Sequence, residues 1–152
     1  MRPSLGAPEF GLADNAFFTG LDAAALARLL PVFREISLPA GAQLYTNGRT
    51  AEGVFLIVRG RVEVVQRTGG IEMTIAQLGP GEFTGERALL TPPERHAWTA
   101  ICREGTRLAY ADGEAVLAAL AAAPAIGVNV ARAFHRRVRD ATHAIDALIA
   151  SP

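Results

Sequence analysis

Short hydrophobic runs separated by turn-forming residues dominate the middle of the chain, from position 33 to position 112. The separators are mostly glycines, and they fall at positions 41, 48, 53, 60, 69, 70, 79, 81 and 105. Short strands closely spaced by turns are typical of a sandwich, a barrel or a jelly roll. The pattern therefore predicts about eight strands in this region.

Two stretches of this region predict particular strands. Val54–Val58 is a continuous apolar run of strand length, and Val62–Val64 resumes just after Gly60, which predicts a tight hairpin. Every second residue of Ile71–Ile75 is strongly apolar. This period of two predicts a strand with one buried face.

Helical patterns flank the strands on the N-terminal side. Residues 1–10 show no periodicity, so we expect positions 1–13 to form a flexible arm before a single domain at 14–152. Asp22 can cap a short helix whose leucines share one face, and Pro31 closes it. We expect this helix to pack on the strands that follow.

The C-terminal part, about 113–150, predicts further helices, including a long one. Asp112 is a plausible cap, the chain is rich in Ala and Leu through Ala123, and Pro124 suits the first position of the next helix. Apolar residues then follow at spacings of 4, 3, 4 and 3: Phe134, Val138, Ala141, Ile145 and Leu148. This heptad seam favours a homodimer; the alternative is a helix packed on its own strands.

Composition narrows the function classes. Fifteen basic residues balance fifteen acidic ones, so no overall charge draws the chain to nucleic acid or to an anionic membrane. Four arginines of the last helix, at 132, 136, 137 and 139, are expected to form a solvated face rather than a nucleic-acid surface. The apolar runs are far shorter than the roughly 20 residues that span a bilayer.

Cysteine and histidine usage argues against metal chemistry. Cys102 is the only cysteine, which excludes an intrachain disulfide and a cysteine-built zinc cage. His96, His135 and His143 are the only histidines, and two of them fall in the predicted helix. We therefore expect that the protein binds no metal and no cofactor and that it is not an enzyme. A single cysteine also fits a reducing compartment, so we expect a cytoplasmic protein.

The segment from Gly79 to Thr99 carries the chemistry. Glycines permit close approach of backbone to a ligand, and residues 85–90 can form a short helix that Pro92 ends. Amide groups at the start of such a helix attract a phosphate. Arg95, ten residues after Gly85, can lie on the next strand and donate to the same phosphate through its positively charged guanidinium group.

Glu86 does not suit a phosphate site by itself, because two anions repel each other. A carboxylate there needs a hydrogen-bond donor, and a sugar hydroxyl would supply one. A singly charged phosphate beside a ribose 2′-hydroxyl describes a 3′,5′-cyclic nucleotide.

The sequence Gly85-Glu86-x-Ala88-Leu89-Leu90, followed by Arg95-x-Ala97, resembles the phosphate-binding cassette of the cyclic-nucleotide-binding domain family. Catabolite activator protein, protein kinase A regulatory subunits and cyclic-nucleotide-gated channels belong to this family. Residues 17–21 and 57–62 resemble family features too. The resemblance implies a mainly β fold with flanking helices: a double-stranded β-helix, or jelly-roll-like β-roll, at about 33–112.

The resemblance also implies site residues. Backbone amides near Gly85, Arg87 and Ala88, with the Arg95 side chain, would hold the cyclic phosphate, while Glu86 would take the ribose hydroxyl. His96 and Ala97 would complete this end of the site. The family usually has a small residue where His96 stands, so His96 would either donate to the phosphate or crowd the pocket. Alignment of the last helix with that of catabolite activator protein makes Thr142 the candidate base contact.

These expectations describe a regulatory domain that binds cyclic AMP or cyclic GMP and relays binding to its C-terminal helix. The alternative is a degenerate domain that dimerises or binds a partner without nucleotide, with Glu86 and Arg95 forming a structural ion pair. Trp98 has two interpretations, stacking on a ligand ring or packing in the core. Transcription factors of the family continue into a DNA-binding domain, so the sequence is either a stand-alone sensor or lacks its output domain.

Overall fold

The computed structural model describes two continuous ranges, 11–90 and 93–120, and seven single positions of the C-terminal part. The single positions are Arg132, His135, Arg136, Arg139, Asp140, His143 and Asp146, all with helical backbone. The residues of the predicted seam and Thr142 lie outside the described residues, as do positions 1–10 of the predicted arm.

Short helices precede the strands, as predicted. A 3₁₀ turn η1 (Ala16–Phe18) leads into helix α1 (Ala23–Leu29) and a second 3₁₀ turn η2 (Leu30–Val32). Asp22 caps α1 as expected, because its carboxylate accepts the amide N–H of Ala25 at 2.8 Å. Pro31 lies in η2, where its missing N–H costs nothing.

Eight strands follow, which agrees with the number expected from the turn pattern. Their bounds are β1 (Arg34–Leu38), β2 (Gln43–Tyr45), β3 (Gly53–Arg59), β4 (Val62–Thr68), β5 (Ile71–Leu78), β6 (Phe83–Thr84), β7 (Thr99–Cys102) and β8 (Thr106–Asp112). A 3₁₀ turn η3 (Glu86–Leu89) separates β6 from β7, and helix α2 (Gly113–Leu120) follows β8.

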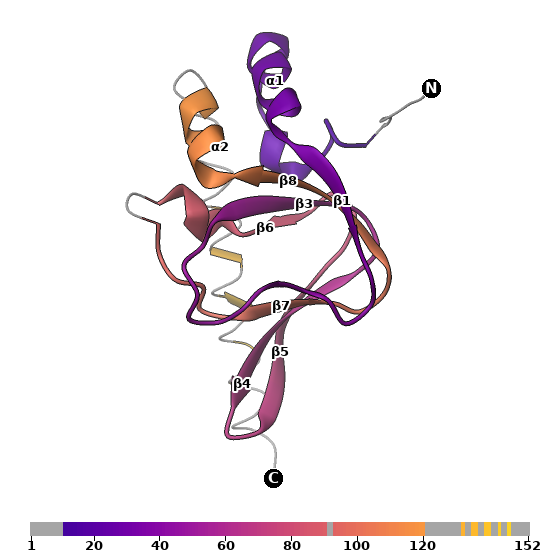
Figure 1. Ribbon diagram of the computed structural model, residues 1–152, viewed down its shortest axis with the longest axis vertical. Helices are drawn as coiled ribbons and strands as arrows, with labels where there is room; N and C mark the ends of the chain where they lie inside the picture. Colours follow the sequence, from indigo (N-terminus) through magenta and orange to yellow (C-terminus); the bar gives the residue numbers. More distant parts are fainter. Residues whose placement is uncertain are drawn as a thin grey trace.

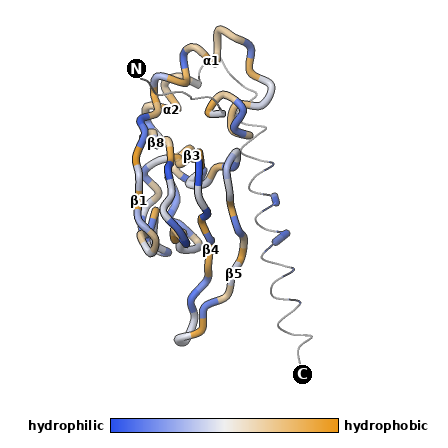
Figure 2. Tube along the Cα trace, turned by 90° about the vertical axis from the view of Figure 1, so that its right-hand side faces the viewer, coloured by the Kyte–Doolittle hydropathy of each residue, from blue (hydrophilic) through white to orange (hydrophobic). Residues whose placement is uncertain are grey.

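The strands form two four-stranded antiparallel sheets, in the orders β1-β8-β3-β6 and β2-β7-β4-β5. Figure 1 shows the sheets facing each other, with α1 and α2 together at one end of the roll. The β4–β5 pair extends away from the other end, as Figure 2 also shows. The mainly β, two-sheet architecture predicted from the sequence is confirmed.

The predicted hairpin at Gly60 is wrong. β3 pairs with β6 and β8, whereas β4 pairs with β5 and β7, so the chain changes sheets at this corner. Gly60 has a φ of +107°, and a Cβ there would meet Thr106 and Gly105, which leaves no room for a side chain. The tight hairpin lies instead at Gly69-Gly70, where both residues have positive φ between β4 and β5.

The alternation expected in β5 holds only near the core. Ile75 is buried, but Ile71 is 69 % exposed because it lies at the tip of the β4–β5 hairpin, beyond the opposite sheet. Asp112, the predicted cap, directly precedes α2, and its carboxylate accepts the hydroxyl of Tyr110 at 3.0 Å.

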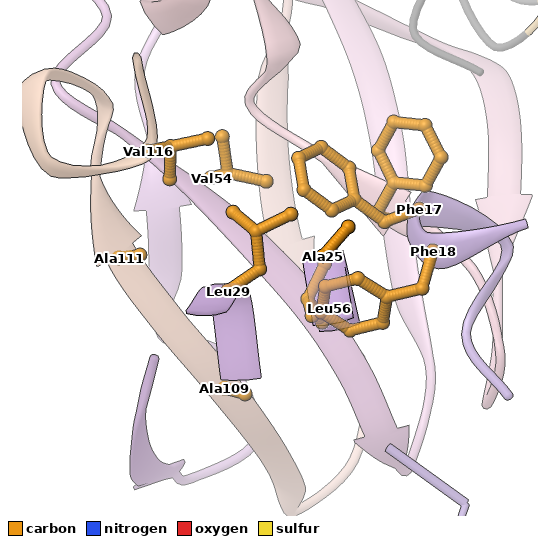
Figure 3. Close-up of a cluster of buried hydrophobic side chains, with 10 residues drawn as sticks. Phe17, Phe18, Ala25, Leu29, Val54, Leu56, Ala109, Ala111 and Val116 are labelled. Carbon is orange, nitrogen blue, oxygen red and sulfur yellow. The ribbon is translucent and has the colours of Figure 1, made fainter. Parts of the chain in front are cut away.

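Two buried clusters lie on the two faces of the β3-containing sheet. Val54 and Leu56 of β3 point outward and pack with the N-terminal aromatic residues and both helices, as Figure 3 shows. Phe55 and Ile57 point inward against the second sheet, where Cys102 is fully buried. The alternation along β3 thus serves both clusters, which explains its continuous apolar run.

Candidate functional site

The turn between β6 and η3 depends on the glycine at position 85. Gly85 has a φ of +90°, and a Cβ there would collide with the carbonyl oxygen of Gly53. Gly53 is constrained too, because its own Cβ would collide with the Tyr110 ring. Close backbone contact therefore fixes this turn against the start of β3.

The short η3 turn that follows holds its carboxylate inside the protein. Glu86 is 6 % exposed, and the amide of Ala88 donates to the Gly85 carbonyl at 3.0 Å. The far side of η3 contacts the start of α2, where a Cβ on Gly113 would lie 2.5 Å from the Ala88 carbonyl oxygen. The turn is thus packed between β3 and α2.

A small cavity gathers five of the predicted site residues. It is lined by Gly85, Glu86, Arg87, His96, Ala97, Tyr45 and Trp98, and its volume is about 10 Å³. A cavity of this size holds about one water molecule, since one water needs roughly 10–15 Å³. The structure therefore brings most of the predicted cassette together around one small space.

The two arginines of the segment have partners outside this cavity. Arg95 is exposed, and its Nη1 donates to the Gly48 carbonyl at 2.7 Å. Arg87 pairs with Glu94, with 2.7 Å between Nη1 and Oε1. Among the described residues no ion pair joins Arg95 to Glu86.

His96 forms the opposite wall of the cavity. Its ring is stacked on Tyr45, with centroids 3.7 Å apart and an angle of 9° between the planes. The side chain is buried, and this burial lowers the pKa of His96 to about 4, although Glu86 acts to raise it and Arg87 to lower it. His96 is therefore a neutral ring at neutral pH.

Tyr45 links this stack to the cassette. Its hydroxyl lies 2.5 Å from the hydroxyl of Thr84, the residue just before Gly85. Neither residue could be predicted from the sequence, because their contact spans 39 positions and neither belongs to a local motif. Trp98 both lines the cavity and packs against the inner cluster, so its two interpretations are not exclusive.

A larger cavity borders the same stack. Its volume is about 430 Å³, and its wall shares Tyr45 and His96 with the smaller one. Phe55 and Tyr110 add aromatic rings, while Arg49 and other polar residues of the β2–β3 segment also line it.

Other kinds of site find no support in the described part of the chain. No group of three or more His, Cys, Asp or Glu residues there is placed to hold a metal ion. No helix among the described residues combines the length and the apolar character needed to cross a membrane.

Comparison with known proteins supports the resemblance noted in the sequence. The profile described as the cyclic nucleotide-binding domain matches residues 35–123. The cyclic AMP receptor protein of Thermus thermophilus is 33 % identical over 138 residues, which cover 90 % of this chain and 63 % of that protein. A cyclic nucleotide-gated potassium channel of Rhizobium etli is 33 % identical over 93 residues, which cover 61 % of this chain and 25 % of the channel.

Solved structures agree with these relatives. The catabolite activator protein of Thermus thermophilus superposes with a TM-score of 0.74 at 30 % identity, covering 88 % of this chain and 63 % of that one. The chain thus spans less than two thirds of the length of these relatives.

Proposed function

Because the chain belongs to the cyclic nucleotide-binding domain family, we propose that it is a regulatory domain whose 85–97 segment binds a 3′,5′-cyclic nucleotide. The observation that carries the proposal is the buried Glu86 beside the left-handed turn at Gly85, both lining one cavity. The amides near Gly85 and Arg87 would meet the phosphate, whereas the predicted Ala88 amide already donates to the Gly85 carbonyl and Ala88 does not line the cavity. Glu86 would accept the ribose 2′-hydroxyl.

Arg95 has to change partner to reach a phosphate in this cavity. Its present partner is one backbone carbonyl at an exposed position, and such a contact is weak in water. A phosphate offers two oxygens to the guanidinium fork, and such charge-assisted bonds are about twice as strong as neutral ones. Ligand binding would therefore draw Arg95 away from Gly48.

The C-terminal helix would complete the site. We propose Thr142 as the base contact and this helix as the element that receives the binding event; Thr142 lies outside the described residues. The name of the Thermus relative favours cyclic AMP over cyclic GMP as the first ligand to test.

A second candidate function is a domain that does not bind nucleotide and acts through dimerisation or a protein partner. The observation that favours it is the small volume of the cassette cavity, together with the position of Arg95 outside it.

Thermal unfolding with and without ligand tests the proposal. We expect saturating cyclic AMP or cyclic GMP to raise the melting temperature of the parent protein, because a ligand that binds only the folded state stabilises it. Arg95→Ala should cost about 2–5 kcal/mol of binding, which weakens affinity by a factor of roughly 30 to several thousand.

The matched control is Arg28→Ala, which removes an exposed arginine of α1. It should leave the ligand response unchanged, and Arg95→Ala should melt close to the parent when no ligand is present. A parent protein that responds to neither nucleotide contradicts the proposed function and favours the second candidate.

A further inference from the structure

The stacked pair Tyr45 and His96 borders two cavities of very different size. The cassette cavity has a volume of about 10 Å³, and the larger aromatic cavity has a volume of about 430 Å³. Both residues line both spaces. The pair is therefore a wall that both cavities share.

The pair also keeps the cassette cavity small. The imidazole is 6 % exposed, and the nearly parallel rings are 3.7 Å apart, so His96 fills the space directly beside Glu86 and Gly85. The Tyr45 hydroxyl contacts Thr84 at 2.5 Å, which fixes the tyrosine ring to the strand that leads into the cassette. A space that holds about one water molecule cannot hold a cyclic phosphate.

The wall can open toward the aromatic cavity. At neutral pH His96 is uncharged, so moving its ring does not move a buried charge. The receiving space is large enough for an imidazole, and Phe55 and Tyr110 offer it new aromatic contacts. Arg49 and Glu52 lie at this cavity and carry the charges that the displaced ring would meet there.

We propose that Tyr45 and His96 set the affinity of the cassette by closing it in the free protein, and that ligand binding displaces the His96 ring into the aromatic cavity. The inference rests on the proposed function, since it concerns the same cassette. Its physical basis is that a site closed for most of the time binds with an affinity reduced by the fraction that is open. His96 is thus an affinity-determining residue that acts against binding.

Removal of the wall should strengthen binding. We expect His96→Ala to bind cyclic AMP about tenfold more tightly than the parent, measured by calorimetry at pH 7.5, because the variant no longer has to break an aromatic pair. Tyr45→Ala removes the other half of the wall and should act in the same direction. Tyr45→Phe keeps the ring and should stay closer to the parent.

A second measurement needs no ligand. Trp98 is the only tryptophan of the chain and lines the cassette cavity with His96. Quenching of its fluorescence by acrylamide should increase in His96→Ala and Tyr45→Ala. The control His135→Ala, which changes an exposed histidine, should leave quenching and affinity unchanged.

The outcomes separate this inference from the proposed function. Tighter binding by both alanine variants, or binding by the variants alone, supports the inference. A parent that binds cyclic AMP together with variants that bind equally or more weakly overturns the inference and leaves the proposed function intact. If parent and variants all fail to bind, both fall.

Discussion

His96 shows how far a single residue can depart from what its sequence position suggests. The cassette motif made it a candidate phosphate contact, and the structure places it at the cassette cavity, stacked on a ring from β2. The members of one short motif, such as Gly85 and Glu86, could be predicted because they are close in sequence. Tyr45 could not, because only the packing of the two sheets brings it there.

Acid should destabilise the protein through His96. Its pKa is about 4 in the folded protein and about 6.5 when unfolded, so between these values the unfolded chain binds more protons. The contribution of neutral His96 to the free energy of unfolding is therefore fully present above pH 6.5. It decreases as the pH falls towards 4, by up to about 3 kcal/mol.

Urea denaturation of the parent and of His96→Gln at pH 7.5, 6 and 5 measures this effect. The variant should lose less stability between the first and last pH. His135→Gln, at an exposed position, serves as the matched control and should follow the parent. Parallel curves for the parent and His96→Gln would show that His96 does not carry the pH dependence.

At the level of elements, turns were easier to locate than strand partners. Glycines correctly marked the ends of the strands, but Gly60 and Gly69-Gly70 give the same local signal while one is a corner between sheets and the other a hairpin. The difference lies in the far partners of β3 and β4. Those partners are set by packing between the sheets, which no local pattern records.

Asn15 joins the N-terminal turn to the roll, and it had no visible role in the sequence. It is 2 % exposed; its side-chain oxygen accepts the Phe17 amide and its nitrogen donates to the Glu82 carbonyl, both at 3.0 Å. Asn15→Ala should therefore lower the free energy of unfolding by about 1–3 kcal/mol, through the lost cap and the lost buried hydrogen bond to Glu82, whose carbonyl keeps the Ile57 amide as a donor.

Urea denaturation measures this loss, and Asn15→Ser provides the comparison. Serine keeps an acceptor for the helical turn but cannot reach Glu82, so its loss should be smaller than that of alanine. An alanine variant as stable as the parent would mean that water replaces both bonds without cost.

For the whole molecule, the spacing of turns predicted the class of fold. It did not predict the order of the strands in the two sheets. Eight strands and flanking helices were predictable, because each depends on a local period of apolar residues. The sheet orders depend on pairings between distant strands, such as β1 with β8. The resemblance to the cyclic nucleotide-binding domain family indicated the jelly-roll-like arrangement, which local periodicity alone could not indicate.

Association of two chains remains a prediction from the heptad spacing of the last helix. Glutamate at both Val138 and Ile145 should convert a dimer into a monomer in light-scattering measurements, because four charges would enter an apolar seam. Arg139→Glu, at an exposed position of the same helix, is the control that should leave the dimer intact. A parent that is already monomeric at high concentration would instead indicate a helix packed on its own roll.

The two close backbone contacts at Gly85 and Gly113 also have a mechanical consequence. Gly85 touches β3 and the Ala88 carbonyl touches the first residue of α2, with no side chain between them to yield. A shift of the cassette backbone by a fraction of an ångström therefore cannot be absorbed by a change of rotamer. Such a shift has to be transmitted to strand β3 on one side and to helix α2 on the other. These glycines therefore couple the cassette turn rigidly to β3 and α2.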